Sequence, residues 1–183
     1  MPFPSIFPPR GSLHEKEKIQ ARSYNKFFNK EERDETKFGY LVQHLEFPVR
    51  FYKKYNGFLG ILSLKDDELY FCSKSTNEGE HTEYFKNIFY LIYSQEQIEA
   101  IKDRFRKEDL SMVFEVIDPI NDPHIIKYDK QNLVLLDMIY NTIDFKKVKY
   151  EHLKAFGERN NINVKELAYE VNNLQEFLSL NGE

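Results

Sequence analysis

The tetrapeptide Lys54-Tyr55-Asn56-Gly57 has the clearest capacity for chemistry in this 183-residue sequence. A lysine amine attacks phosphorus only when it is deprotonated, and partial burial and nearby positive charge both favour the neutral form. Arg50 and Lys53 are candidate neighbouring cations. A glycine lets the backbone pass close to a bulky ligand, and an asparagine side chain can hydrogen-bond a sugar hydroxyl. On this interpretation Lys54 is a nucleophile.

A structural interpretation of the same residues stays open at this point. Asn-Gly between apolar runs is the strongest short-range signal for a β-hairpin, because both residues tolerate positive φ. Arg50 to Gly60 then forms strand, tight turn and strand, and Lys54 is a solvated charge at a strand end. Such a tetrapeptide arises by accident in about one chain in ten of this length, so it does not decide between the two interpretations.

The overall composition is typical of a soluble globular protein. Hydrophobic residues make up 41% of the sequence and charged residues 31%, which excludes a disordered or membrane protein. Since the net charge is −4, any nucleic-acid contact has to come from a local basic face, and the 16 Phe and 12 Tyr offer stacking surfaces for bases. Cys72 is the only cysteine, and the five histidines lack zinc-type spacing, so neither a disulfide nor a metal ligand is predicted. No secretory signal or run of eighteen apolar residues is present, and we therefore expect a cytoplasmic location.

The hydrophobic patterning predicts a mixed α/β fold that positions these residues. Strands are predicted at 58–64 and 69–74, which form a hairpin, and at 110–119, 124–128 and 133–140; helices are predicted at 83–93, 95–107, 150–160 and near 174–180. Ser94 and Gln97 are predicted to form a capping box. Glu115 lies in the middle of an apolar strand, where a carboxylate is costly unless it is paired. It is therefore either half-exposed on a solvated face or directed into a site.

The N-terminal region is predicted to be irregular over residues 1–12, which carry five prolines. A basic-aromatic stretch follows at residues 21–29. Its structural interpretation is a surface segment with Phe27 and Phe28 anchored in the core. Its functional interpretation is a pair of cations, Arg22 and Lys26, that bind a polyphosphate.

Four short motifs follow one another in an order that resembles the covalent nucleotidyltransferase superfamily, which contains ATP-dependent RNA and DNA ligases and mRNA capping enzymes. They are Arg22 to Asn29, Lys54 to Gly57, Ser73-Lys74-Ser75 and Phe114-Glu115-Val116. The Lys-Phe-Phe-Asn segment before Lys54 is similar to the bacteriophage-type RNA ligases, which seal single-stranded RNA or nicked tRNA. Asn121 and the stretch 125–128 also resemble the next strand of those enzymes. The combined pattern spans about residues 10–136 and is more specific than any one motif.

The resemblance implies an ATP-dependent RNA ligase with an α/β (α+β) nucleotidyltransferase core, in which antiparallel sheets are flanked by helices. Lys54 is implied as the nucleophile that attacks the α-phosphorus of ATP to give lysyl-AMP and pyrophosphate. The AMP then moves to an RNA 5′-phosphate, which is sealed to a 3′-OH. Glu115 is implied to hold the ribose hydroxyls, and Asn56 takes the place where many relatives carry Asp. The other implied nucleotide or phosphate contacts are Arg10, Arg22, Lys26, Gly57 and Lys74.

The resemblance also implies cofactors and partners. Magnesium with ATP would neutralise the polyphosphate and the departing pyrophosphate. The implied partners are RNA ends, either single-stranded or nicked, with tRNA as one possible source, and no membrane. Two alternatives stay open. One is another covalent nucleotidyltransferase, such as a DNA ligase or a GTP-using capping enzyme; the other is a non-catalytic nucleotide- or RNA-binding module.

Two later motifs of the superfamily are not found. No Glu-Gly dipeptide occurs between Pro119 and Glu183. Lys147-Val148-Lys149 has the spacing of the paired lysines, but it comes too early, so we interpret it as capping a strand or opening a helix. We therefore expect residues 1–183 to form an RNA ligase adenylyltransferase domain that is incomplete at its C-terminus, binds nucleotide weakly and does not complete ligation.

Overall fold

The structure is a computed structural model that describes residues 18–74, 76–123 and 128–180. The chain divides into two compact units. The first unit contains the described residues up to Asn25 together with Tyr55–Val164, and the second contains Lys26–Lys54 and the described residues from Lys165 onward.

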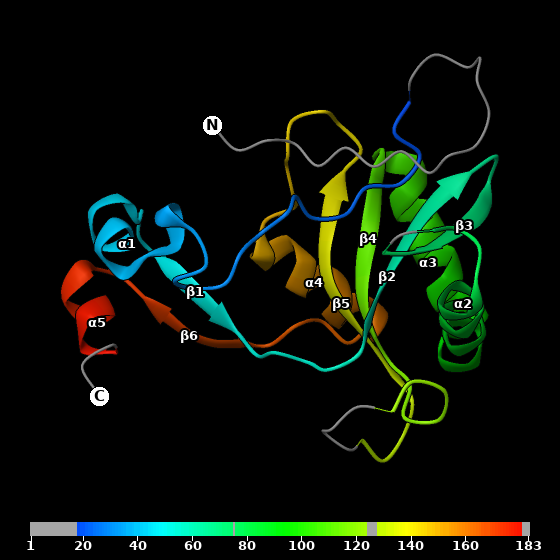
Figure 1. Ribbon diagram of the computed structural model, residues 1–183. Coiled ribbons are helices and arrows are strands. Elements are labelled where there is room, and N and C mark those ends of the chain that lie inside the picture. The colour runs from blue at the N-terminus through cyan, green and yellow to red at the C-terminus, as the bar shows by residue number, and fades with distance from the viewer. Residues whose placement is uncertain (1–17, 75, 124–127, 181–183) are drawn as a thin grey trace. The chain divides into compact units, whose positions relative to one another are not determined.

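The first unit is built on a four-stranded antiparallel sheet with the strand order β3-β2-β4-β5 (Figure 1). Its strands are β2 (Phe58–Lys65), β3 (Glu68–Ser73), β4 (Leu110–Ile117) and β5 (Asn132–Tyr140). Asp66 and Asp67 connect β2 to β3, and both have positive φ (52° and 61°), as a tight two-residue hairpin turn requires. This confirms the hairpin predicted after Phe58.

Two helices, α2 (Glu80–Ile92) and α3 (Gln95–Lys107), cover one face of this sheet (Figure 1). Phe85 and Phe89 of α2 are fully buried and pack against Phe114 of β4, with ring centroids 5.7 Å and 6.4 Å from that ring. Helix α4 (Tyr150–Asn160) adds Leu153 to the same hydrophobic core. Burial of this large aromatic and aliphatic surface is the main force that holds the first unit together.

The capping box predicted for α3 is confirmed. The Ser94 hydroxyl accepts a hydrogen bond from the backbone N–H of Gln97, and the Gln97 side chain accepts one from the N–H of Ser94. The predicted apolar stripe of Ile98, Ile101 and Phe105 is buried. Local signals therefore determine where this helix starts and which face it buries.

The opposite face of the sheet carries polar side chains and is crossed by the N-terminal residues. Gln20 donates to the carbonyl oxygen of Leu64 at 3.0 Å, and the N–H of Arg22 donates to the Ser111 hydroxyl at 2.9 Å. One strand further, the Tyr24 hydroxyl donates to the nearly fully buried Asp137 at 2.6 Å. These bonds satisfy polar groups that would otherwise be costly to bury.

The second unit contains a two-stranded antiparallel sheet of β1 (Val49–Tyr52) and β6 (Leu167–Val171). Three short helical segments accompany it: η1 (Asp34–Thr36), α1 (Phe38–His44) and α5 (Leu174–Ser179). The rings of Phe38 and Phe177 stack with centroids 6.0 Å apart, which joins α1 to α5.

The hairpin predicted around Asn56-Gly57 is wrong. Strand β1 pairs with β6, whereas β2 pairs with β3 and β4, so residues 53–57 join two different sheets. Gly57 does not have positive φ. The Asn-Gly propensity for a turn is overridden because each flanking strand finds its partners elsewhere in the chain.

The prediction that Phe27 and Phe28 are anchored in the core is not confirmed for Phe27. Phe27 is not anchored in the core, because 78% of its surface is exposed. Phe28 is half-buried between two cations, with Lys26 Nζ 5.1 Å and the Arg33 guanidinium carbon 4.4 Å from its ring centroid. The irregular arm at residues 1–12 and nearly all of the strand predicted at 124–128 lie outside the described residues.

The predicted fold class is confirmed: antiparallel sheets are flanked by helices in a mixed α/β arrangement. Among the residues that the structure describes, no helix is both long enough and apolar enough to cross a lipid bilayer.

Candidate nucleotide-binding site

The segment that follows Lys54 lies against the end of β4. The backbone N–H of Gly57 donates to Oε1 of Glu115 at 2.8 Å, and Phe58 pairs with Val116 in the sheet. The Glu115 side chain is on the face opposite the helices, because its strand neighbour Phe114 packs into the helix-covered core. The carboxylate in the apolar strand is therefore half-buried and hydrogen-bonded to the segment that carries the candidate nucleophile.

Gly57 is required here by close approach of two backbones. A Cβ atom at this position would lie 2.1 Å from the carbonyl oxygen of Val116 and 2.8 Å from its carbonyl carbon. Neither atom belongs to a flexible side chain, so a larger residue cannot be accommodated without moving β4 or the segment itself. The sequence predicts close approach to a ligand at Gly57, whereas the backbone of Val116 lies there in the structure.

Asn56 is held by a residue that the sequence analysis did not select as a site residue. Its backbone N–H donates to the hydroxyl of Tyr128 at 3.0 Å. Tyr128 comes thirteen residues after Glu115 in the segment between β4 and β5, and no periodicity or spacing marks it. Its only signal in the sequence was its place in a stretch that resembles RNA ligases.

Lys54 is exposed, and it is the last residue of the stretch Lys26–Lys54 that belongs to the second unit. Arg50 and Lys53, the cations proposed as neighbours of Lys54, are each paired with a carboxylate. Glu170 belongs to β6, and Glu166 directly precedes that strand. Arg50 Nε lies 2.6 Å from Glu170, and Lys53 Nζ lies 3.5 Å from Glu166.

A further lysine of the second unit was missed in the sequence analysis. Lys165 is buried, and its Nζ lies 4.1 Å from the ring centroid of Tyr52. The N–H of Lys53 donates to the carbonyl oxygen of Glu166 and so extends the β1–β6 pairing toward this lysine. Nothing in the sequence could indicate it, because its position depends on a pairing between residues more than a hundred positions apart.

Lys74 lies at the same end of its sheet as Gly57 and Glu115. It directly follows β3, whose last residue, Ser73, pairs with Gly60 of β2. Its side chain is exposed, as expected for a lysine that meets a phosphate or solvent.

Arg22 is engaged at a different place. Its guanidinium donates to the carbonyl oxygen of Ile143 at 2.8 Å and to the Asn25 side chain at 3.2 Å, and lies over the Phe145 ring. Burial lowers the pKa of this guanidinium, and the charge of Asp144 partly opposes that effect. The side chain thus ties the N-terminal segment to the residues that follow β5. Lys26 belongs to the second unit, and Arg10 lies outside the described residues.

Lys147 has a structural partner. Its Nζ lies 3.3 Å from Oδ1 of Asp137, the same carboxylate that accepts the Tyr24 hydroxyl. Lys149 precedes α4 as its N-cap residue. Of the two interpretations, capping a strand or opening a helix, the position of Lys149 agrees with the second.

Within residues 18–74, 76–123 and 128–180, no group of three or more His, Cys, Asp or Glu side chains is arranged to hold a metal ion. The candidate site of the first unit therefore consists of Asn56, Gly57, Glu115 and Tyr128. Asn56 and Gly57 closely follow Lys54 in the chain, and Lys74 lies at the same end of the sheet. A carboxylate and backbone groups beside a lysine suit recognition of a nucleoside phosphate better than acid-base hydrolysis.

Comparison with known proteins assigns the chain to a family. A sequence profile described as RNA ligase matches residues 10–182. The chain therefore belongs to this RNA ligase family. A search of curated protein sequences found no match.

Solved structures share the fold at low sequence identity. An archaeal ATP-dependent RNA ligase is 14% identical with a TM-score of 0.60, over 76% of this chain and 36% of its own. A mutant RNA ligase of Naegleria gruberi with ATP and Mn is 16% identical with a TM-score of 0.59, over 91% of this chain and 49% of its own. A putative ATP-dependent DNA ligase from Aquifex aeolicus is 16% identical with a TM-score of 0.54, over 76% of this chain and 38% of its own. The chain thus spans less than half the length of each of these structures.

Proposed function

We propose that this chain carries out the adenylation step of an ATP-dependent RNA ligase, with Lys54 as the nucleophile. The observation that carries the proposal is the hydrogen bond between the Gly57 N–H and Glu115, which joins the segment beside Lys54 to a carboxylate at the end of β4. Membership of the RNA ligase family supports this proposal.

The proposed step is a phosphoryl transfer. The deprotonated amine of Lys54 attacks the α-phosphorus of ATP, a P–N bond forms, the bond from that phosphorus to the bridging oxygen breaks, and pyrophosphate leaves. The amine proton is lost to solvent. Such a step depends on positioning and charge neutralisation more than on acid-base groups.

Glu115 is proposed to bind the ribose. A carboxylate has two oxygens and can accept several hydrogen bonds, so Glu115 can accept from the Gly57 N–H and from ribose hydroxyls together. Asn56 supplies an amide that can hydrogen-bond the sugar. Asn56 lies two residues from Lys54, and the next residue, Gly57, packs its backbone against Val116.

The proposed phosphate contacts are Arg10, Arg22, Lys26 and Lys74. Lys74 is exposed at the Gly57 end of its sheet. Arg22 has to exchange its bond to Ile143 or Asn25 in order to meet a phosphate. Mg²⁺ is proposed to arrive bound to the triphosphate, as this ion commonly does, and to neutralise the charge that develops on pyrophosphate.

The later steps are proposed for RNA ends. The 5′-phosphate of RNA attacks the lysyl-AMP phosphorus, the P–N bond breaks, and an AMP-capped end forms. A 3′-OH then attacks the capped phosphate and AMP leaves. Capping is needed because an unactivated phosphate monoester lacks a good leaving group.

The test is covalent labelling with α-labelled ATP and Mg²⁺, followed by denaturation. We expect label to remain on the wild-type protein and to move to the RNA, as an AMP-capped 5′ end, when a 5′-phosphorylated RNA is added. GTP in place of ATP is expected to give no label, and transfer of label from GTP would instead indicate a capping-type enzyme.

A second candidate function is a non-catalytic nucleotide-binding module, which is favoured by the absence of a Glu-Gly dipeptide between residues 119 and 183. Equilibrium dialysis with ATP separates the two. Bound nucleotide without covalent label would support the module and contradict the ligase proposal.

A further inference from the structure

We infer that Tyr128 is a positioning residue for the nucleophilic segment: its hydroxyl fixes the backbone of Asn56 and thereby sets how Lys54 approaches the nucleotide. The inference rests on the proposed role of Lys54. Tyr128 itself is not proposed to touch the reacting atoms.

The first observation is that two consecutive backbone N–H groups are held by two side chains. Asn56 donates to the Tyr128 hydroxyl at 3.0 Å, and Gly57 donates to Glu115 at 2.8 Å. Both acceptors belong to the first unit, and both donors lie within three residues of Lys54 along the chain. An extended residue spans at most about 3.3–3.6 Å, so Asn56, two residues further along, stays within about 7 Å of Lys54.

The second observation is that residues 53–57 belong to none of the strands that the structure describes. Residues 53–57 join β1 to β2, which belong to different sheets, so the regular ladder ends on either side of Asn56. The N–H of Lys53 bonds to Glu166, and Phe58 enters the ladder with Val116. Between these points, the Tyr128 and Glu115 bonds restrain the backbone at two consecutive residues.

The third observation is that a described residue close to Tyr128 in the chain, Gln131, is bonded to a buried carboxylate. The Asp118 carboxylate, which is almost fully buried, accepts from the Asn121 side chain at 2.8 Å and from Gln131 at 2.9 Å. These two residues flank Tyr128 in sequence. The Gln131 bond therefore attaches the chain three residues after Tyr128 to Asp118, the residue that follows β4.

The chemical consequence is specific to the hydroxyl. Replacing Tyr128 by Phe keeps the ring but leaves the half-buried Asn56 N–H without this acceptor, and the backbone beside the nucleophile gains freedom. Because misplacement of a reacting group by about 1 Å can cost a large part of a rate, the loss should fall on the chemical step. Nucleotide binding, which depends on other groups, should change little.

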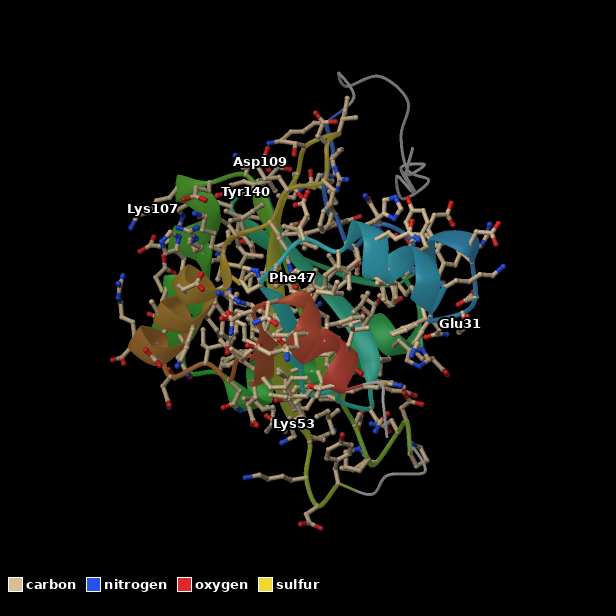
Figure 2. The ribbon with its side chains drawn as sticks, turned by 90° about the vertical axis from the view of Figure 1, so that its left-hand side faces the viewer. Glu31, Phe47, Lys53, Lys107, Asp109 and Tyr140 are labelled. Atoms are coloured by element: carbon tan, nitrogen blue, oxygen red, sulfur yellow. The ribbon has the colours of Figure 1, made fainter. Side chains whose placement is uncertain are left out.

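The matched control is Tyr140→Phe. The Tyr140 hydroxyl is also half-buried and donates to a carboxylate, that of Glu108, at 2.8 Å. Tyr140 is the last residue of β5, and its neighbour Asn141 bonds to the backbone of Asp109, beside which Tyr140 lies in Figure 2. This is the end of the sheet away from Gly57, because Leu110 pairs with Tyr140 whereas Val116 pairs with Phe58.

The experiment measures two quantities in wild type, Tyr128→Phe and Tyr140→Phe: the rate of covalent labelling by ATP across ATP concentrations, and amide hydrogen exchange at Asn56. For Tyr128→Phe we expect about a tenfold lower labelling rate at saturating ATP, with KM changed by less than about threefold. We also expect about tenfold faster exchange at Asn56. Tyr140→Phe should match wild type in both, and circular dichroism should show all three proteins folded.

Two results would overturn the inference. If wild type is labelled and Tyr128→Phe is labelled at the same rate, or shows wild-type exchange at Asn56, Tyr128 does not position the segment although the proposed function stands. If wild type itself takes no label, the proposed function fails and the inference that rests on it fails too.

Discussion

Gly57 and Glu115 are joined by a 2.8 Å hydrogen bond across 58 residues of sequence. The bond gives a carboxylate in an apolar strand a partner, which reduces the cost of placing it there. It also attaches the residues after Lys54 to β4. This hydrogen bond therefore stabilises the fold and, in the proposed function, also positions the residues of the site.

Removal of the Glu115 carboxylate should affect both roles. Glu115→Leu leaves the Gly57 N–H without this acceptor, so we expect the free energy of unfolding to fall by about 1–3 kcal/mol in urea titration. Glu115→Gln retains a side-chain acceptor and should lose less stability, while both variants should label poorly with ATP. Equal stability of wild type and the Leu variant would show that the bond contributes nothing.

Alanine at Gly57 should be poorly tolerated. The added Cβ would meet the Val116 carbonyl at 2.1 Å, and relief requires movement of backbone. We expect Gly57→Ala to lower the free energy of unfolding by about 1–3 kcal/mol or more and to reduce labelling strongly. Gly39→Ala is the control: nothing lies within 4 Å of its Cβ position, and it lies in α1, where alanine favours helix. A Gly57→Ala protein as stable and active as Gly39→Ala would contradict the close approach.

Substitution of Lys147 should separate stability from chemistry. Lys147 pairs with the nearly buried Asp137, so Lys147→Met leaves that carboxylate with one partner fewer. Because the lysine is itself 42% exposed, we expect a loss of only about 1–2 kcal/mol in unfolding free energy. The ATP-labelling rate per folded molecule should not change. A stable Lys147→Met protein with greatly reduced labelling would instead place Lys147 among the catalytic lysines.

The Asp118 carboxylate should make stability depend on pH. Burial raises its pKa, but hydrogen bonds from Asn121, Gln131 and the backbone N–H of Ile120 together lower it below the ordinary value of 3.8. A depressed pKa in the folded state contributes stability above the unfolded pKa, and this contribution is lost as the pH falls through the folded value. The destabilisation caused by Asp118→Asn should therefore be larger at about pH 7 than at about pH 2.5 in chemical denaturation. An unfolding free energy difference that is the same at both pH values would contradict this.

Local patterns were enough to predict much of the fold. The predicted bounds of α3 and α4 agree with the structure, and for α3 a capping box and an apolar stripe define them. The hairpin of β2 and β3 follows from the short polar turn between two apolar strands. The turn at Asn56-Gly57 was predicted incorrectly because long-range strand pairing, and not a local pattern, determines the structure there. The pairing of β1 with β6 joins residues far apart in the chain, and no local pattern encodes it.

The site was predicted unevenly. Glu115 could be singled out because a charge in an apolar strand requires an explanation, and Gly57 because it follows a candidate nucleophile. Tyr128 and Lys165 could not, since their positions depend on the segment between β4 and β5 and on the β1–β6 pairing. Arg22 illustrates a different limit: its charge was evident, but its contacts with Ile143 and Phe145 follow from the tertiary fold.

The most direct test of the account is intact mass spectrometry after incubation with ATP and Mg²⁺, with peptide mapping of the adduct. Lys54→Ala is compared with Lys53→Ala, since Lys53 is the adjacent lysine and pairs with Glu166. The account predicts a mass gain of one AMP on wild type and on Lys53→Ala, mapped to Lys54, and no gain on Lys54→Ala. An unmodified wild-type protein, or an adduct that persists in Lys54→Ala, would contradict it.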